Sequence, residues 1–208
     1  MTLKLNLGCG RNILEGWTNI DLQPGPGVNL IENLDYLGPA HENPFPAELP
    51  FENDVADEFL LSHVIEHISM PLDLMGELWR IAKPDARMVI RVPYGSSNDA
   101  YEDPTHVRNY FTGSFAYFAQ PTYWRADYGY SGDWQAERIT LSLDERRYGL
   151  VSREQMLGEI TGYRNVVLEM VCELRAVKPR RAQDKALQVA PDVSIVLVDA
   201  EGRSVREA

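Results

Sequence analysis

The sequence predicts an α/β domain built around a mostly parallel sheet. Strand-like segments alternate with a segment of helical periodicity over residues 3–92, which is typical of βαβ units. The first strand-like segment ends in Gly8-Cys9-Gly10, a tight turn that lets the backbone pass close to a ligand. A chain of 208 residues can bury one sizeable core, and no linker divides it. We therefore expect a single domain over residues 1–208.

The expected strands of the first half follow from their apolar patterning and their flanking turns. An alternating run is typical of a half-buried strand, and a short continuous apolar run of a fully buried one. A proline-rich loop separates the third run from the fourth. The runs that meet these criteria are residues 3–7, 18–22, 28–34, 56–64 and 87–92.

One amphipathic helix is expected between the last two of these strands. Residues 71–82 carry apolar side chains at the spacing that places them on one helical face. Pro71 suits the first turn of a helix, and Lys83-Pro84-Asp85 ends the pattern.

An aromatic-rich stretch at about residues 94–148 then interrupts the alternation. It holds 13 of the chain's 20 aromatic residues and shows only a short helix near 113–119 and a strand near 138–143. We interpret this stretch as an insertion that caps the domain.

The chain closes with one more helix and two strands. Ser152 and Gln155 form a capping box, which predicts a helix over residues 152–161. The final strands are expected at 165–177 and 193–199, joined by a polar turn.

Composition excludes several classes of protein. The net charge is −11, which argues against nucleic acid as a partner because phosphate neutralisation needs a basic face. The sequence holds only two cysteines, no run of 18 apolar residues and no secretory signal pattern. We therefore expect a cytoplasmic protein without a membrane segment.

The glycine turn and the acid after the second strand are the first candidate binding residues. A third glycine, which dinucleotide-binding loops carry, is missing after Gly10. NAD and FAD are thus poorly supported. Asp21 stands where a carboxylate would hydrogen-bond two ribose hydroxyls, although by itself it could equally be a loop carboxylate.

A second candidate site is the string His63-Val-Ile-Glu66-His67, which matches the H-x-x-E-H pattern of some zinc enzymes. Zinc binding would need both histidines on one helical face and a third ligand. Here the string begins directly off a strand, and Pro71 follows soon after. We therefore expect no resident metal, and keep a zinc-dependent hydrolase through His63, Glu66 and His67 only as an alternative.

Several motifs in order resemble those of class I (Rossmann-like) S-adenosylmethionine-dependent methyltransferases, and most of all the small bacterial and phage enzymes of the type-11-like group. The resemblance covers about residues 3–118 and rests on LNLGCG, GWTNIDL, LPFENDVADEFLLSHVIEHI, RMVIRVP and the Asp103-Pro-Thr-His106-Val-Arg segment. It implies a mostly parallel seven-stranded sheet with helices on both faces. It also implies that the H-x-x-E-H string lies at the end of the fourth strand, beside the cofactor.

The resemblance assigns cofactor roles residue by residue. The loop under the methionine and ribose would be Leu7, Gly8, Cys9 and Gly10; Asp21 would bind the ribose and Leu22 the adenine; Asn33 and Leu34 would border the adenine, with Asp35 as a competitor; Ser62 and His63 would line the methionine end. Two departures stand out. Asn6 replaces the usual acid before the first glycine, and the short Gly10–Asp21 spacing implies a stunted first helix.

Methyl transfer to a hydroxyl benefits from a general base, most often histidine. His106 is the first candidate, with Asp103 to orient it, and His67 is the second. Asp103 to His106 could equally be a structural turn capped by Asp103. His41 lies in the proline-rich loop and is expected to have no role.

The aromatic residues of the cap suit a sugar, a sugar nucleotide or another small molecule as acceptor, though they could instead build the cap's own core. We expect O-methylation of such an acceptor. A non-catalytic subunit that binds the cofactor is the other alternative. The sequence does not predict an oligomeric state.

Overall fold

The computed structural model describes residues 2–37 and 48–207. His41 lies outside these ranges. The strands are β1 (Lys4–Leu7), β2 (Thr18–Asp21), β3 (Leu30–Ile31), β4 (Ala56–Ser62), β5 (Ala82–Pro93), β6 (Trp134–Asp144), β7 (Glu169–Ala176), β8 (Asp192–Val198) and β9 (Ser204–Glu207). The helices are α1 (Pro71–Ile81), α2 (Asp99–Glu102), α3 (Glu145–Tyr148) and α4 (Arg153–Gly162), and the 3-10 turns are η1 (Leu34–Tyr36), η2 (Ile65–His67), η3 (Thr112–Phe118), η4 (Gln120–Trp124) and η5 (Lys185–Leu187).

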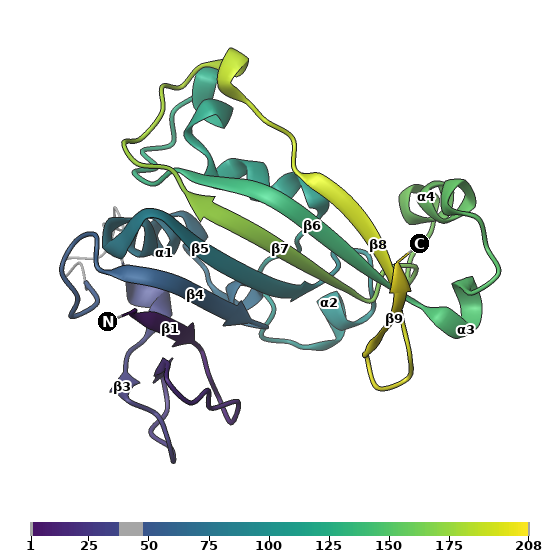
Figure 1. Cartoon of the computed structure of the whole chain (residues 1–208), viewed down its shortest axis with the longest axis horizontal. Helices are drawn as coiled ribbons and strands as arrows, with labels where there is room; N and C mark the ends of the chain where they lie inside the picture. The colour runs from purple at the N-terminus through teal and green to yellow at the C-terminus, as the bar shows by residue number, and fades with distance from the viewer. Residues whose placement is uncertain (1, 38–47, 208) are drawn as a thin grey trace.

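All of these strands join one sheet in the order β3-β2-β1-β4-β5-β7-β6-β8-β9 (Figure 1). The ladders from β3 to β5 are parallel. β7 then runs antiparallel between β5 and β6. Chain order reverses between β1 and β4, and ligands bind at such a switch point, outside the carboxyl ends of the strands.

The expected seven-stranded sheet is corrected to a mixed sheet of nine strands in the described part of the chain. The polar segment after β7 is not a tight turn. It crosses over β6, so that β8 pairs parallel with β6 from Arg138 to Asp144. β7 and β8 run antiparallel to each other, but β6 lies between them, so a tight hairpin cannot join them and the connection must be long. β9 folds back on β8 as the added edge.

Helices do not follow every strand of the sheet. Within the described ranges, the connections from β1 to β2 and from β2 to β3 carry none, because both are short. Helix α1 buries Leu74, Met75, Leu78 and Ile81, and its Met75 carbonyl accepts a hydrogen bond of 3.0 Å from the Trp134 indole. Figure 1 places α3 and α4 beyond the end of β6.

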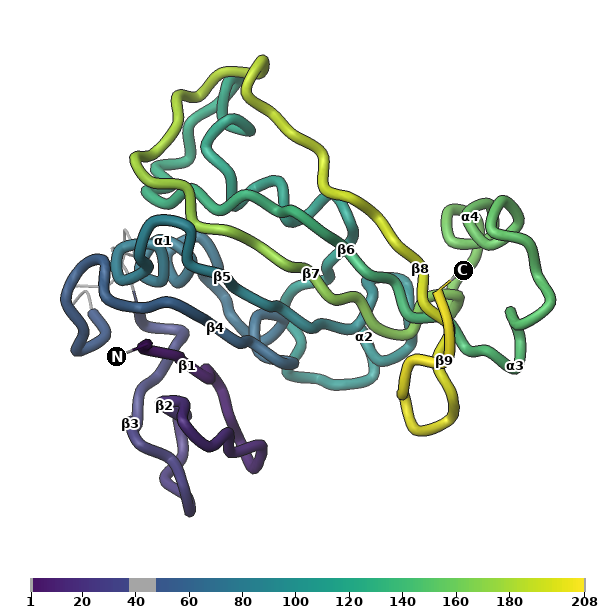
Figure 2. The backbone as a smooth tube through the Cα atoms, in the orientation of Figure 1, coloured from purple at the N-terminus to yellow at the C-terminus, as the bar shows by residue number. Residues whose placement is uncertain are grey.

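The aromatic-rich stretch contributes to the sheet as well as to a covering segment. Its residues 134–144 form β6, which is longer than the strand expected at 138–143. The turns η3 and η4 lie beside the crossover that carries η5, as the tube in Figure 2 shows. Gln188 Nε2 donates to the Pro121 carbonyl at 3.2 Å. The stretch is therefore held by a segment that lies far along the sequence.

Candidate functional site

The glycine turn lies at the switch point, between the carboxyl ends of β1 and β4. Gly8 and Gly10 both adopt left-handed backbone conformations, with φ of +61° and +52°. A side chain on Gly8 would meet Val64 Cγ2 at 2.5 Å, whereas one on Gly10 would meet nothing within 4 Å. The turn is thus packed against the H-x-x-E-H segment on one side and open on the other.

Asp21 faces this turn from the end of β2. Its Oδ2 accepts a hydrogen bond of 2.7 Å from the Gly10 amide, and its Oδ1 accepts one of 2.9 Å from the Gln23 amide. The carboxylate remains partly exposed. Leu22, which follows it, is 53% exposed. The structure therefore brings together three of the expected elements of a nucleoside site: a glycine turn, an acid and an exposed apolar side chain.

Leu7 and Cys9 reach this site only through their backbone. Both side chains are buried. Burial, with a smaller contribution from the Asp21 charge, raises the pKa of the Cys9 thiol. Cys9 is therefore a packing residue of the turn and a poor nucleophile.

A buried amide network replaces the stunted first helix. Asn6 Nδ2 donates to the Asn12 carbonyl at 2.8 Å and to Asn19 Oδ1 at 2.9 Å. Asn19 in turn bonds the amide and the carbonyl of Leu14. These bonds hold residues 11–17 as turns, so the glycine turn does not run into a helix N-terminus. Asn6 therefore has a structural role in this network. An amide serves that role because it can donate to both Asn12 and Asn19, which the acid expected from the resemblance could not do when ionised.

The adenine-side residues divide between core and surface. Asn33 caps η1 by accepting from the Asp35 amide at 3.1 Å, and Leu34 is buried in the core. Asp35 is engaged with Ser69, whose amide donates to its Oδ1 at 2.6 Å. Asp35 thus fixes the segment after the H-x-x-E-H string.

His63 follows Ser62 at the end of β4 in a left-handed conformation, with φ of +56°. Its Nε2 lies 2.9 Å from Glu169 Oε1, and its Nδ1 lies 3.4 Å from Glu66 Oε1. The contact with Glu169, followed by that with Glu66, raises the pKa of His63 to about 9. His63 is therefore cationic at neutral pH.

Glu169 and its second partner Arg91 are residues of the candidate site that sequence reasoning missed. Arg91 Nη2 donates to Glu169 Oε2 at 2.7 Å. Burial alone would raise the pKa of Glu169, but the hydrogen bonds from His63 and Arg91 lower it. Strand pairing places Glu169 of β7 opposite Pro93 of β5. The His63 amide bonds the Arg91 carbonyl of the same strand, so the acid and His63 meet across the end of β5. No local signal marks a residue 106 positions away.

The H-x-x-E-H string does not form a helix. The string follows β4 directly, as the sequence predicted, and its residues Ile65 to His67 form the single 3-10 turn η2. His63 points to Glu169, whereas His67 contacts residues 105 and 106. The two histidines of the string therefore have different partners, which does not favour the alternative zinc arrangement through His63, Glu66 and His67.

His67, Asp103 and His106 do come together. The imidazole rings of His67 and His106 pack edge to face with centroids 4.7 Å apart. His106 Nε2 lies 4.0 Å from Asp103 Oδ2, at the limit of an ion pair. Asp103 also forms the expected structural turn, because it accepts from the Thr105 amide at 2.8 Å. Both interpretations of this segment describe part of the geometry.

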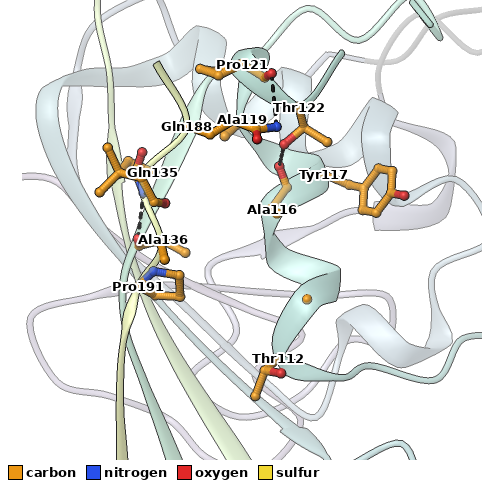
Figure 3. A pocket seen from close by; sticks show the side chains of 13 residues that line it. Thr112, Ala116, Tyr117, Ala119, Pro121, Thr122, Gln135, Ala136, Gln188 and Pro191 are labelled. Carbon is orange, nitrogen blue, oxygen red and sulfur yellow. Dashed lines mark hydrogen bonds between the residues drawn. The ribbon is translucent and has the colours of Figure 1, made fainter. Parts of the chain in front are cut away.

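Two of the pockets in the described part of the chain lie along the η3 segment. One, of about 430 Å³, lies between η3, η4, β6 and the crossover, with Thr112, Ala116 and Ala136 on its walls (Figure 3). Its lining residues include none of the cofactor candidates. The other, of about 580 Å³, is lined by Arg108 and by the aromatic residues Tyr110, Phe111, Tyr117, Phe118 and Tyr128. Tyr110 and Arg108 contact the H-x-x-E-H segment, so the second pocket is the one that borders the candidate site.

None of the helices in residues 2–37 and 48–207 is long and apolar enough to cross a membrane. No protein-family profile matches the sequence, and no curated protein matches it.

Solved structures do match. An S-adenosylmethionine-dependent methyltransferase from Archaeoglobus fulgidus aligns with a TM-score of 0.56 at 16% identity, over 84% of this chain and 86% of that one. The YcgJ protein of Bacillus subtilis aligns with a TM-score of 0.51 at 13% identity, over 87% of this chain and 93% of that one. Likeness at such identity shows the fold alone. The chain therefore has the Rossmann-like fold of S-adenosylmethionine-dependent methyltransferases.

Proposed function

We propose that the chain is an S-adenosylmethionine-dependent methyltransferase that acts on a hydroxyl group of a sugar, a sugar nucleotide or another small molecule. The observation that carries the proposal is the left-handed Gly8–Gly10 turn, with the Asp21 carboxylate against it at the switch point of the sheet. The open space above Gly10 leaves room for a ligand, and Asp21 can accept two hydroxyl hydrogen bonds. Leu22 offers an apolar surface for a purine ring.

The bound cofactor would supply an electrophilic methyl group on a sulfonium sulfur, so the protein's task is orientation and removal of a proton. Val64 packs on Gly8, which puts the turn after β4 next to the proposed cofactor loop. His67 and His106 follow at that edge. They are two imidazoles at this edge that can assist a hydroxyl nucleophile.

The acceptor is proposed to bind in the aromatic pocket beside Arg108. Aromatic faces suit sugar and phenol rings, and a volume of about 580 Å³ accommodates a small molecule. The net charge of −11 disfavours a nucleic-acid duplex.

Calorimetric titration with S-adenosylmethionine and S-adenosylhomocysteine tests the cofactor assignment. We expect micromolar affinity, about −8 kcal/mol. Asp21→Ala should weaken it at least tenfold, since hydrogen bonds to a charged group contribute about 1.5–3 kcal/mol. Asp192→Ala, which removes an exposed acid at the start of β8, is the matched control and should bind like the wild type. No binding of either compound would refute the proposal.

Turnover separates an enzyme from a non-catalytic subunit. A radiolabelled methyl donor is offered with sugars, sugar nucleotides and phenols in turn. Transfer to any of them supports the enzyme. Tight cofactor binding without transfer to any acceptor favours the subunit that only binds the cofactor.

A further inference from the structure

We propose that Glu66, His67 and His106 bind a divalent transition-metal ion beside the proposed cofactor site. One potential ligand atom from each residue lies within 4.8 Å of the other two. Metal–ligand bonds of about 2.0–2.2 Å hold donors about 3–4 Å apart, so a side-chain adjustment of about 1 Å closes the site. Sequence reasoning expected no metal, because it considered only the histidines of the H-x-x-E-H string.

Glu66 is the strongest indication. Glu66 is 2% exposed, and neither of its carboxylate oxygens has a hydrogen-bond partner in the described ranges. His63 Nδ1 approaches Oε1 to 3.4 Å, within ion-pair distance but without hydrogen-bond geometry. His63 thus compensates part of the Glu66 charge, but it leaves both buried oxygens without a hydrogen bond, and buried carboxylates are commonly hydrogen-bonded or bound to metals.

Backbone hydrogen bonds hold the segment that carries His106 beside Glu66. The Glu66 carbonyl accepts hydrogen bonds from the amides of Val107 and Arg108, at 2.9 and 3.2 Å. Arg108 also donates to the Ser69 carbonyl at 2.7 Å. His106 is thereby fixed beside Glu66 and His67, although about forty positions separate it from them in the sequence.

The hydrogen bonds around His67 fix its tautomer. The Thr105 hydroxyl donates to Asp103 Oδ1 at 2.6 Å, so it can only accept from His67 Nδ1, 3.0 Å away. The Thr105 carbonyl, 3.3 Å from the same nitrogen, is also an acceptor. Nδ1 therefore carries the proton, and Nε2 keeps its lone pair. Metal-bound histidines are held in this way, with the other ring nitrogen donating to a carbonyl, a carboxylate or a group that these fix.

In His106 the roles of the two nitrogens are exchanged, and the outer nitrogen lies at ion-pair distance from a carboxylate without a hydrogen bond. Its Nε2 faces Asp103 Oδ2, whereas its Nδ1 is buried and has no hydrogen-bond partner in the described part of the chain. The side chain is 8% exposed, which suits a metal ligand better than a base that must reach a substrate directly. Asp103 thus orients both imidazoles, as a positioning residue for the site.

The donor set selects the kind of ion. Two imidazole nitrogens and one carboxylate oxygen suit Zn²⁺, Fe²⁺, Co²⁺ or Mn²⁺, whereas Ca²⁺ and Mg²⁺ favour oxygen ligands. Three protein ligands leave coordination positions for an acceptor hydroxyl, and a bound cation lowers the pKa of such a group.

This use of the ion rests on the proposed function. The acceptor's O–H proton passes to solvent, its oxygen forms the bond to the methyl carbon, and the C–S electron pair returns to sulfur, which leaves as a thioether. The ion changes no oxidation state.

The test is calorimetric titration of the chelator-stripped chain with ZnCl₂ and with MnCl₂, which needs neither cofactor nor acceptor. We expect one site per chain with micromolar or tighter affinity for Zn²⁺. Glu66→Gln and His106→Ala should weaken it at least 100-fold, and Asp103→Asn about 10- to 100-fold through the imidazole orientation. Glu58→Gln, which neutralises a surface acid of β4 paired with Lys4, should bind like the wild type.

His63→Asn decides between this set and the H-x-x-E-H string, because asparagine tolerates the left-handed backbone at position 63. Unchanged or tighter zinc binding supports the proposal, and a loss comparable to that of Glu66→Gln overturns it. Circular dichroism of each variant identifies any that fail to fold; if His106→Ala does, Asp103→Asn and His63→Asn still decide. No zinc binding by a wild type that binds S-adenosylmethionine overturns the metal site alone, whereas zinc binding without cofactor binding refutes only the proposed function.

Discussion

A side chain at position 8 should destabilise the fold far more than one at position 10. Both glycines have left-handed φ angles, and forcing alanine into that conformation costs about 1–2 kcal/mol. Only at Gly8 would the new Cβ also meet Val64 Cγ2 at 2.5 Å, which adds an overpacking cost of about 1–3 kcal/mol. Gly8→Ala should therefore lose about 2–5 kcal/mol of unfolding free energy, and Gly10→Ala about 1–2 kcal/mol.

Urea denaturation of the two variants measures this difference directly. Alanine lowers the entropy of the unfolded chain similarly at both positions, so that contribution cancels in the comparison. For a chain of this length the additional loss at Gly8 corresponds to a melting temperature lower by about 2–12 °C. Combining Gly8→Ala with Val64→Ala removes both methyl groups that cause the clash, so the pair should be less destabilised than the sum of its parts. Equal destabilisation by Gly8→Ala and Gly10→Ala would refute the packing argument.

Three further predictions concern stability and are checked by urea denaturation. Asn19→Ala leaves the bonded groups of Asn6 and Leu14 without partners and should cost about 2–4 kcal/mol; a loss below 1 kcal/mol would contradict the network that replaces the first helix. Arg181→Ala leaves the fully buried Asp133 carboxylate without its cation and should cost about 3–5 kcal/mol; a loss below about 1 kcal/mol would contradict a stabilising role for this pair. The hydrogen bond from Lys83, with help from the Leu3 amide, lowers the pKa of Asp57. The stabilisation by this carboxylate is therefore present above the ordinary carboxyl pKa and is lost as pH falls through the lowered pKa. Asp57→Asn should flatten the dependence of stability on pH below about pH 4, and an unchanged slope would contradict this assignment.

Local patterns were sufficient to predict most elements of the first half of the chain. Pro71 and the apolar spacing after it predicted a helix over 71–82, and α1 spans Pro71–Ile81. The alternation in LKLNL predicted a strand, and β1 forms there. The glycines after it predicted a tight turn, which the left-handed φ angles of Gly8 and Gly10 confirm. These features depend on neighbours a few residues apart, for which helical and strand periodicity carry the information.

The order of the last strands could not be predicted in the same way. The segment 193–199 has clear strand patterning, but patterning does not say which strand it joins. Its pairing with β6 depends on the crossover that Gln188 fixes to Pro121 and that Arg181 fixes to Asp133. Those contacts exist only after β6, β7 and the η4 segment have packed together.

The sequence by itself determined the glycine turn, the acid at the end of β2 and the strand end that carries the H-x-x-E-H string, because each depends on short-range chemistry. Only the tertiary structure decided the partners of that string. It separates His63, which contacts Glu169 of β7, from Glu66 and His67, which lie beside His106. Side chains tens of positions apart are brought within bonding distance by strand register and backbone hydrogen bonds, and these long-range contacts leave no periodic signal in the chain.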